Sequence, residues 1–190
     1  MASSATSRRG PAARAEPADT DWVVDAYRSY FGYVFALLGR LGVPTASVED
    51  VAQEVFLVLH RRRHEFRNDS SVRTWLHGIA LHMGRRHRER ARRVLDPSRR
   101  PPAPAEPRTP EEDVSTKRDL ERLDALLDGL TGEQREVFVL AEIAELPVPE
   151  IAELLSVKLN TVYSRLRLAR AAVRAGIDRV RAEEGVDAGR

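Results

Sequence analysis

The stretch that decides the fold is VPEIAELLSVKLNTVYSRLRLARAAVRA, residues 148–175. Its first part predicts a short helix over 149–155, because proline is tolerated in an opening helical turn, where the N–H groups are unpaired. Residues 156–158 interrupt this helix. The second part predicts another helix with Asn160 or Thr161 as its N-cap, because these side chains accept a hydrogen bond from a backbone N–H. Two helices joined by a tight turn are typical of the helix-turn-helix, whose second helix enters the DNA major groove.

The second predicted helix has an apolar face and a basic face. The expected buried stripe recurs at helical spacing and consists of Val162, Leu166, Ala169 and Val173. The outer face carries Ser164, Arg165, Arg167, Arg170 and Arg174. Ten acidic and four basic residues lie in 117–155, whereas one acidic and seven basic residues lie in 156–181. This sorting favours phosphate binding by the second helix over the alternative of a solvated arginine face in an ordinary bundle.

Length and composition limit the class of protein. The 190 residues leave room for one ordinary domain or two small ones. The chain has no apolar run of membrane-spanning length and does not start like a secretory signal, so we expect a cytoplasmic protein without membrane insertion. The absence of cysteine excludes disulfides and thiolate metal sites within this chain.

Three amphipathic helices are predicted in the first half of the chain. The first runs from Asp21 to about Leu41, and the second opens at Ser47 in a pattern that resembles a capping box. The third starts at Ser70 or Ser71 and is expected to bury Trp75, which we assign to the core. Its second half is rich in arginine, since residues 61–100 hold thirteen arginines and four acids. The sequence therefore predicts a second basic surface.

A proline-rich segment divides the chain. Six prolines lie within 96–115 and favour an extended backbone over a helix. Helices are expected again over about 111–128 and 131–145, the latter opened by a capping box at Thr131 and Gln134. The predicted fold class is all-α, with two small helical domains and a Pro-rich linker. The expected limits are a disordered tail 1–20, a first domain 21–95, the linker 96–115, a second domain 116–176 and a C-terminal tail 177–190.

Three motifs carry a family resemblance. Residues 50–56 have the pattern Asp-x-x-Gln-Glu-x-Phe, residues 74–80 have Thr-Trp-Leu-x-x-Ile-Ala, and Glu-Ile-Ala at 150–152 precedes Thr-Val-x-Ser-Arg at 161–165. In this combination and spacing the chain resembles bacterial RNA polymerase sigma factors of the extracytoplasmic-function (ECF) type, which have region two and region four without region three. The resemblance covers about 21–175 apart from the linker. The residues alone lead only to a two-domain helical DNA-binding protein.

The resemblance implies an alternative sigma factor, which is not an enzyme and has no cofactor or metal. Region two (21–95) and region four (116–176) would bind core RNA polymerase at the clamp of the largest subunit and at the flap, and an anti-sigma factor is implied as a further partner. Promoter DNA would be recognised at minus-ten and minus-thirty-five elements and melted without ATP.

The resemblance also assigns residue roles, by matching positions. Polymerase contacts are expected from Asp50, Gln53, Glu54 and Phe56. Minus-ten contacts are expected from Phe66, Asn68, Ser70, Arg73, His82, Arg85, Arg86 and Arg88. Minus-thirty-five contacts are expected from Lys158, Asn160, Thr161, Tyr163, Ser164, Arg165, Arg167 and Arg170. The chain departs from the family pattern at His82 (commonly Asn), Asn160 (commonly Gly), and Tyr163 and Leu168 (frequently Arg), so the promoter sequence of a relative is not carried over.

Three alternatives to a sigma factor are a metal-dependent enzyme, a one-component regulator and a structural adaptor. His60 and His64 have the helical spacing of two metal ligands, but no carboxylate is placed as a third ligand and arginines flank them. The stronger alternative is a one-component regulator, which predicts a single DNA-binding surface and operator binding without polymerase. A structural adaptor would need neither arginine face. The second basic surface favours the sigma factor.

Overall fold

The computed structural model describes residues 21–66, 71–94 and 114–187, and within them the protein is helical without any strand. The first domain contains α1 (Asp21–Arg40), α2 (Thr45–Arg62), a 3₁₀ turn η1 (Arg63–Glu65) and α3 (Val72–Val94). The second domain contains α4 (Val114–Asp128), α5 (Gly132–Phe138), a π-helical segment η2 (Val139–Ile143), α6 (Val148–Leu155) and α7 (Leu159–Asp187). The all-α prediction is confirmed. The predicted tail 1–20 and most of the predicted linker lie outside the described residues.

The first three helices pack on one another around an aliphatic core. Its largest fully buried side chains are Val34, Leu38, Leu41, Val51, Val55, Leu59 and Leu76. The predicted start of α2 at Ser47 is wrong, because the helix begins at Thr45 after Pro44 and has no side-chain cap. The φ of Pro44, fixed at −55°, and its carbonyl, which accepts the Ser47 N–H at 2.8 Å, start the helix without a capping box.

The second domain has its core beneath α7, which packs against α4, α5 and α6. The predicted stripe is confirmed, since all four of its residues are buried. The capping box at the start of α5 is also confirmed: Thr131 Oγ1 accepts the Gln134 N–H at 3.3 Å, and Gln134 Oε1 accepts the Thr131 N–H at 3.1 Å. Both contacts are local, which is why the sequence pattern predicted them.

The turn of the helix-turn-helix is present, but its second helix starts earlier than predicted. Ser156 ends α6 in the left-handed conformation, with φ at 54°. Asn160 and Thr161 are not N-caps, because α7 begins at Leu159 and the Lys158 carbonyl accepts the N–H groups of Thr161 and Val162. Both predicted caps therefore lie within the first turn of the helix, on its exposed or half-buried side.

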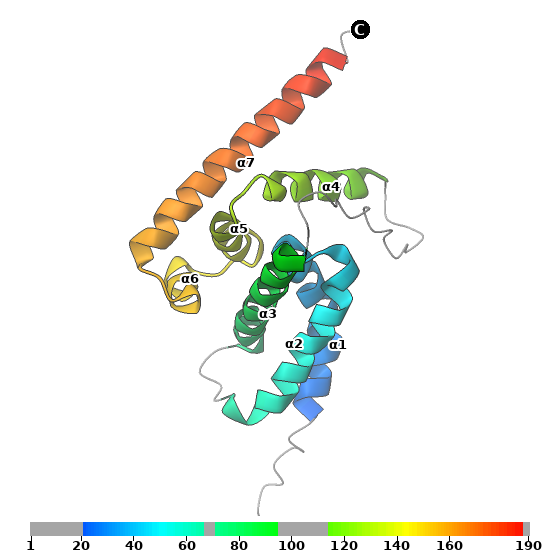
Figure 1. Ribbon diagram of the computed structural model, residues 1–190, viewed down its shortest axis with the longest axis vertical. Helices are drawn as coiled ribbons and strands as arrows, with labels where there is room; N and C mark the ends of the chain where they lie inside the picture. Colours follow the sequence, from blue (N-terminus) through cyan, green and yellow to red (C-terminus); the bar gives the residue numbers. More distant parts are fainter. Residues whose placement is uncertain (1–20, 67–70, 95–113, 188–190) are drawn as a thin grey trace, which may run out of the picture.

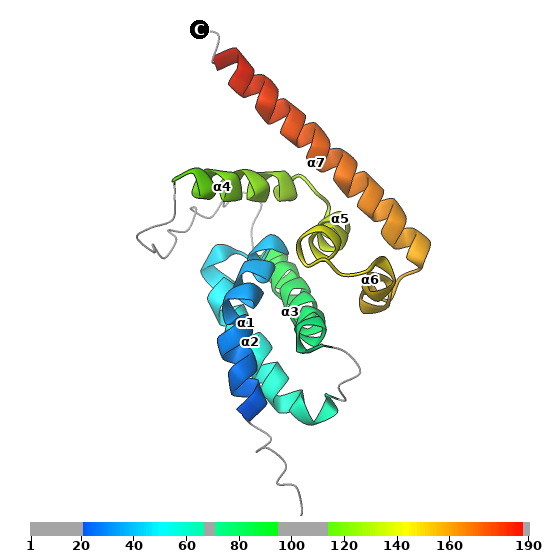
Figure 2. The same ribbon diagram turned by 180° about the vertical axis from the view of Figure 1, so that it is seen from behind.

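The arrangement in space brings α3 next to the second domain (Figure 1). Helices α1, α2 and α3 form one bundle, α4 crosses one end of it, and α5 and α6 lie beside α3. The view from behind shows the same order, with α7 running diagonally away from the bundle toward the C-terminus (Figure 2). Helix α7 reaches Asp187, past the predicted limit of the second domain at residue 176.

Candidate nucleic-acid interface

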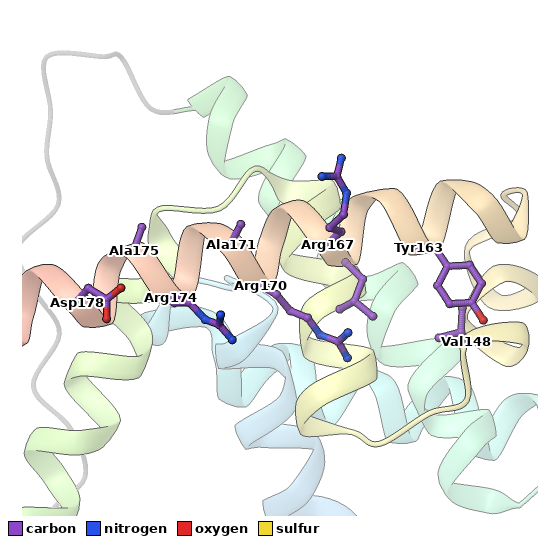
Figure 3. A pocket seen from close by; sticks show the side chains of 9 residues that line it. Val148, Tyr163, Arg167, Arg170, Ala171, Arg174, Ala175 and Asp178 are labelled. Atoms are coloured by element: carbon purple, nitrogen blue, oxygen red, sulfur yellow. The ribbon is translucent and has the colours of Figure 1, made fainter.

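The first part of α7 presents a polar and basic surface. Its exposed side chains include Asn160, Tyr163, Ser164, Arg167, Leu168 and Arg170, with Lys158 exposed just before the helix, while Thr161 is half-buried. Tyr163, Arg167, Arg170 and Arg174 lie on successive turns and line an open groove of about 750 Å³ (Figure 3). An exposed basic helix after a tight turn has the geometry needed to enter a DNA groove.

The arginines of this surface are not equivalent. Arg165 is 22% exposed and its Nη2 lies 2.7 Å from Glu133 Oε2 of α5. Arg170 donates to Glu142 Oε1 from Nε at 2.8 Å and from Nη2 at 2.6 Å. Among the described residues, Arg167 has neither an ion pair nor a hydrogen-bonding side-chain partner. The structure therefore leaves Arg167 available for DNA and ties Arg165 to the scaffold, a distinction that the sequence pattern did not reveal.

The second basic surface lies on α3, where the predicted minus-ten residues divide in the same way. His82 and Arg86 are exposed. Arg85 and Arg88 instead bind Glu136 of α5 in the other domain. Asn68 and Ser70 lie outside the described residues. The signal for the Glu136 contact is absent from the local sequence, because the partners are 51 and 48 residues apart.

Phe66 has a packing role that the sequence did not indicate. Its ring stacks on Trp22 of α1 and on Trp75 of α3, with ring centroids 5.3 Å apart in each pair. Ser71 accepts the Thr74 N–H at 3.0 Å, as expected of a residue that caps α3. These contacts anchor both ends of the segment that connects α2 to α3. The prediction that Trp75 belongs to the core is consistent with its packing against both rings.

Arg73 lies at the junction of the two domains. Its guanidinium is 4.6 Å from the centre of the Tyr33 ring, and Nη2 donates to the Tyr33 hydroxyl at 3.3 Å and to the Ala144 carbonyl at 3.4 Å. The Tyr33 hydroxyl lies 2.6 Å from His77 Nε2. His77 is 1% exposed, and burial, assisted by the positive charge of Arg73, lowers its pKa to about 4.

We expect this buried histidine to make the protein less stable in mild acid. The unfolded chain binds a proton at His77 near pH 6.5, whereas the folded chain does so only near pH 4. The free energy of unfolding should therefore fall as the pH is lowered through this window, by up to about 3 kcal/mol. Urea unfolding of the wild type and of His77→Gln measures this, since glutamine keeps an acceptor for Tyr33 but does not titrate. The slope should flatten in His77→Gln and persist in the exposed control His82→Gln; equal slopes in all three would refute the assignment.

Helix α2 presents a third surface, which is acidic and apolar. Asp50, Gln53 and Glu54 are exposed, as expected for partner contacts. Phe56, the fourth predicted polymerase contact, is only 5% exposed and packs against the rings of Tyr27 and Phe31.

The main apolar side chain on this surface is that of Leu57, which the sequence motif did not indicate. Leu57 is 55% exposed, the most exposed large apolar side chain among the described residues. With Val24, Tyr27 and Gln53 it surrounds a hollow of about 380 Å³ whose floor includes Phe56. The sequence did carry a signal for this exposure. Leu57 is seven positions after Asp50 and three after Glu54, so it lies on the same outer face of α2 as these acidic residues.

The structure thus defines a two-domain helical protein with a helix-turn-helix, a second basic surface and an acidic-apolar surface. Among the described residues, no helix is both long and apolar enough to span a membrane, and no group of three or more potential ligands is placed to hold a metal ion. Two family models match the chain: Sigma-70 region 2 over residues 26–94 and Sigma-70, region 4 over residues 120–173.

Relatives point the same way. The RNA polymerase sigma factor CnrH of Cupriavidus metallidurans is 32% identical over an alignment of 148 residues, covering 72% of this chain and 76% of that protein. The RNA polymerase sigma factor YlaC of Bacillus subtilis is 29% identical over 169 residues, covering 87% and 98% of the two chains. The ECF RNA polymerase sigma factor SigE of Mycolicibacterium smegmatis is 34% identical over 151 residues, covering 77% of this chain and 58% of that protein.

Solved structures agree with the fold. CnrH in complex with the cytosolic domain of CnrY superimposes with a TM-score of 0.61 at 26% identity, over 84% of this chain and 89% of that chain. The sigma factor RpoE of Bartonella quintana superimposes with a TM-score of 0.67 at 18% identity, over 84% and 98% of the two chains. The chain belongs to the sigma-70 family of RNA polymerase sigma factors, and within it to the ECF type. Its function is that of an alternative sigma factor, which directs transcription initiation at specific promoters.

Proposed function

We propose that three surfaces of this chain divide the work of promoter-specific initiation. The observation that carries this proposal is their different chemistry: α2 is acidic and apolar, α3 is arginine-rich, and the start of α7 is polar and basic. Basic surfaces suit DNA phosphate, whereas an acidic surface around an apolar hollow repels DNA and suits a basic protein partner. A one-component regulator would need no surface of this last kind.

The α2 surface docks on the clamp of the polymerase largest subunit. Its hollow accepts an apolar side chain of the partner between Tyr27 and Leu57, and Asp50, Gln53 and Glu54 bind basic or polar groups at the rim. This division of an apolar centre and a charged rim is typical of protein interfaces. Phe56 supports this surface from the core, because its ring packs against the rings of Tyr27 and Phe31 and holds them in place.

The exposed face of α3 and the segment before it hold the minus-ten element. Arg86 and His82 lie on the same exposed face, where Arg86 suits a phosphate and His82 suits a base by stacking or hydrogen bonding. The sequence has no ATP-binding motif, so the energy for melting comes from capture of unpaired bases outside the duplex. Arg85 and Arg88 join this surface when they are not bound to Glu136.

Region four reads the minus-thirty-five element and contacts the polymerase flap. Arg167, Tyr163 and Ser164 are exposed on the part of α7 that follows the turn. Arg165 and Arg170 hold the orientation of α7 through Glu133 and Glu142. The protein works in the bacterial cytoplasm, where promoter DNA and polymerase are found, and has no catalytic residue of its own.

A protein inhibitor completes the proposal. The structure of CnrH contains the cytosolic domain of CnrY, so a sigma factor of this family forms a complex with a second protein. By analogy, an anti-sigma partner of this chain covers the α2 hollow and competes with polymerase for Leu57 and Tyr27. Competition between this partner and core polymerase for the same surface is sufficient to hold the factor inactive.

Promoter-dependent transcription tests the function. Purified bacterial core polymerase is given genomic fragments from upstream of the protein's own gene, with and without the protein. New start sites are expected only with the protein, and mapping them yields both promoter elements. Protection of a short operator by the protein alone, without any new transcript, would instead favour the one-component regulator.

A further inference from the structure

The two domains are held together by a carboxylate from one and two arginines from the other. Glu136 of α5 is 4% exposed. Its Oε1 accepts from Arg85 Nε at 2.9 Å and its Oε2 accepts from Arg85 Nη2 at 2.6 Å, while Arg88 Nη2 also donates to Oε1. Both arginines come from α3. Burial alone would raise the pKa of the Glu136 carboxyl, but the hydrogen bonds and charges of the two arginines outweigh it and hold that pKa below its usual range.

A second set of contacts closes the same boundary. The last turn of α1 has carbonyls without partners inside the helix, and such carbonyls attract cations. Arg135 of α5 donates from Nε to the Arg40 carbonyl at 2.6 Å and from Nη2 to the Gly39 carbonyl at 3.4 Å. Within the first domain, Arg88 also donates to the carbonyl of Leu41, which follows α1. The second domain thus contacts both α3 and the end of α1.

The contacts with Glu136 involve two arginines, Arg85 and Arg88, that the proposed function assigns to promoter DNA. Arg85 and Arg88 lie on the arginine-rich half of α3, next to the exposed Arg86. A guanidinium binds a carboxylate and a phosphate with the same bidentate geometry, so the two ligands exclude each other. While Glu136 is bound, its carboxylate offsets one of the two positive charges, and the side chain of Arg88 is only 16% exposed.

We propose that Glu136 forms an autoinhibitory clasp, which binds Arg85 and Arg88 across the domain boundary in the free protein and releases them to promoter DNA when the domains separate. The inference rests on the proposed function, since only a DNA-binding α3 makes the contact inhibitory. Removing Glu136 and Arg88 from water costs free energy that offsets much of the attraction among the three groups, and Arg85 stays 40% exposed, so the clasp is weak enough to open when polymerase or DNA binds. The linker leaves the two domains joined after they separate.

Energy transfer between two dyes measures the opening of the clasp. The chain has no cysteine, so Ser29→Cys on α1 and Ala172→Cys on α7 provide two unique labelling sites, both exposed. Glu136→Gln keeps the shape of the side chain but removes its charge, and transfer efficiency is expected to fall. The control Glu121→Gln removes the same charge from the exposed face of α4 and should leave the efficiency unchanged.

DNA binding tests the inhibitory part of the inference. A labelled 20-nucleotide oligo(dT) serves as the probe for phosphate contacts, and Glu136→Gln should bind it on the order of fivefold more tightly than Glu121→Gln does. Arg85→Gln should also lower transfer efficiency, but without a gain in oligo(dT) affinity. Because Arg85 lies outside α5, this variant tests the clasp even if Glu136→Gln fails to fold, which circular dichroism reports.

The two proposals fail in different ways. Unchanged transfer efficiency in folded Glu136→Gln and Arg85→Gln would overturn the clasp, while transcription by the wild type would still support the proposed function. A second outcome would overturn only the inhibition. If transfer efficiency falls in Glu136→Gln and in Arg85→Gln, but Glu136→Gln binds oligo(dT) no more tightly than Glu121→Gln does, the contact with Glu136 holds the domains together without inhibiting DNA binding.

Discussion

Leu57→Asp is expected to lower the affinity of the protein for core RNA polymerase by about 100-fold or more. Leu57 is the exposed apolar centre of the α2 surface, and it lies beside the hollow formed with Val24 and Tyr27. A carboxylate at this position would be buried in the complex without a partner, which is among the largest single penalties at an interface. Because Leu57 is exposed in the free protein, the substitution should leave its folding intact.

The measurement is equilibrium binding of a labelled sigma factor to purified core polymerase, with thermal unfolding as the check on the fold. Leu120→Asp is the matched control, because Leu120 is an exposed leucine of α4, far from α2 in the chain. The control should bind as the wild type does. Wild-type affinity in folded Leu57→Asp would place the polymerase contact elsewhere on the chain and remove α2 from the docking proposal.

Local sequence patterns predicted most of the helices. The stripe beneath α7 and the capping box at Thr131 depend on residues three or four positions apart, and such spacing is visible in the sequence. The position of a helix start was less predictable. Pro44 and Lys158 start α2 and α7 through backbone geometry, so the polar residues that follow them were wrongly expected to act as caps.

The far end of α7 shows a different limit. The second domain was predicted to end at residue 176, but its last helix continues to Asp187. Gly176 lies inside this helix at a point where α4 packs closely against it, since a Cβ on Gly176 would lie 2.3 Å from Leu126 Cδ2. A glycine that signals flexibility in the sequence here permits close approach of two helices, and only the tertiary structure distinguishes the two.

The sequence predicted which residues form the candidate site, but not which of their side chains are free to bind DNA and which are already paired with other residues of the chain. The basic faces of α3 and α7 followed from periodicity and charge. The acidic partners of Arg85, Arg165 and Arg170 are 51, 32 and 28 positions away in the chain, so no local pattern indicates which arginines are bound. Phe56 shows the same limit, because an aromatic residue in a recognised motif reads alike whether it faces a partner or the core.

Arg167→Ala is expected to weaken binding to the minus-thirty-five duplex by about tenfold or more, and Arg165→Ala by much less. An exposed arginine that reads a base edge contributes about 1–3 kcal/mol of discrimination. Arg167 has this freedom, whereas Arg165 is held 2.7 Å from Glu133 and contributes mainly to the contact between α5 and α7. Arg165→Ala should therefore lower the midpoint of thermal unfolding slightly, since a partly exposed pair contributes little.

The assay uses the duplex found by mapping the start sites, together with variants that carry one substituted base pair each. If Arg167 reads a base, Arg167→Ala loses affinity for the natural duplex but not for the variant whose contacted pair is already changed, because the interaction is absent from both. If Arg167 binds only phosphate, the loss is uniform across all duplexes. A larger loss in folded Arg165→Ala than in Arg167→Ala would reverse the assignment and mean that the ion pair with Glu133 opens when region four binds DNA.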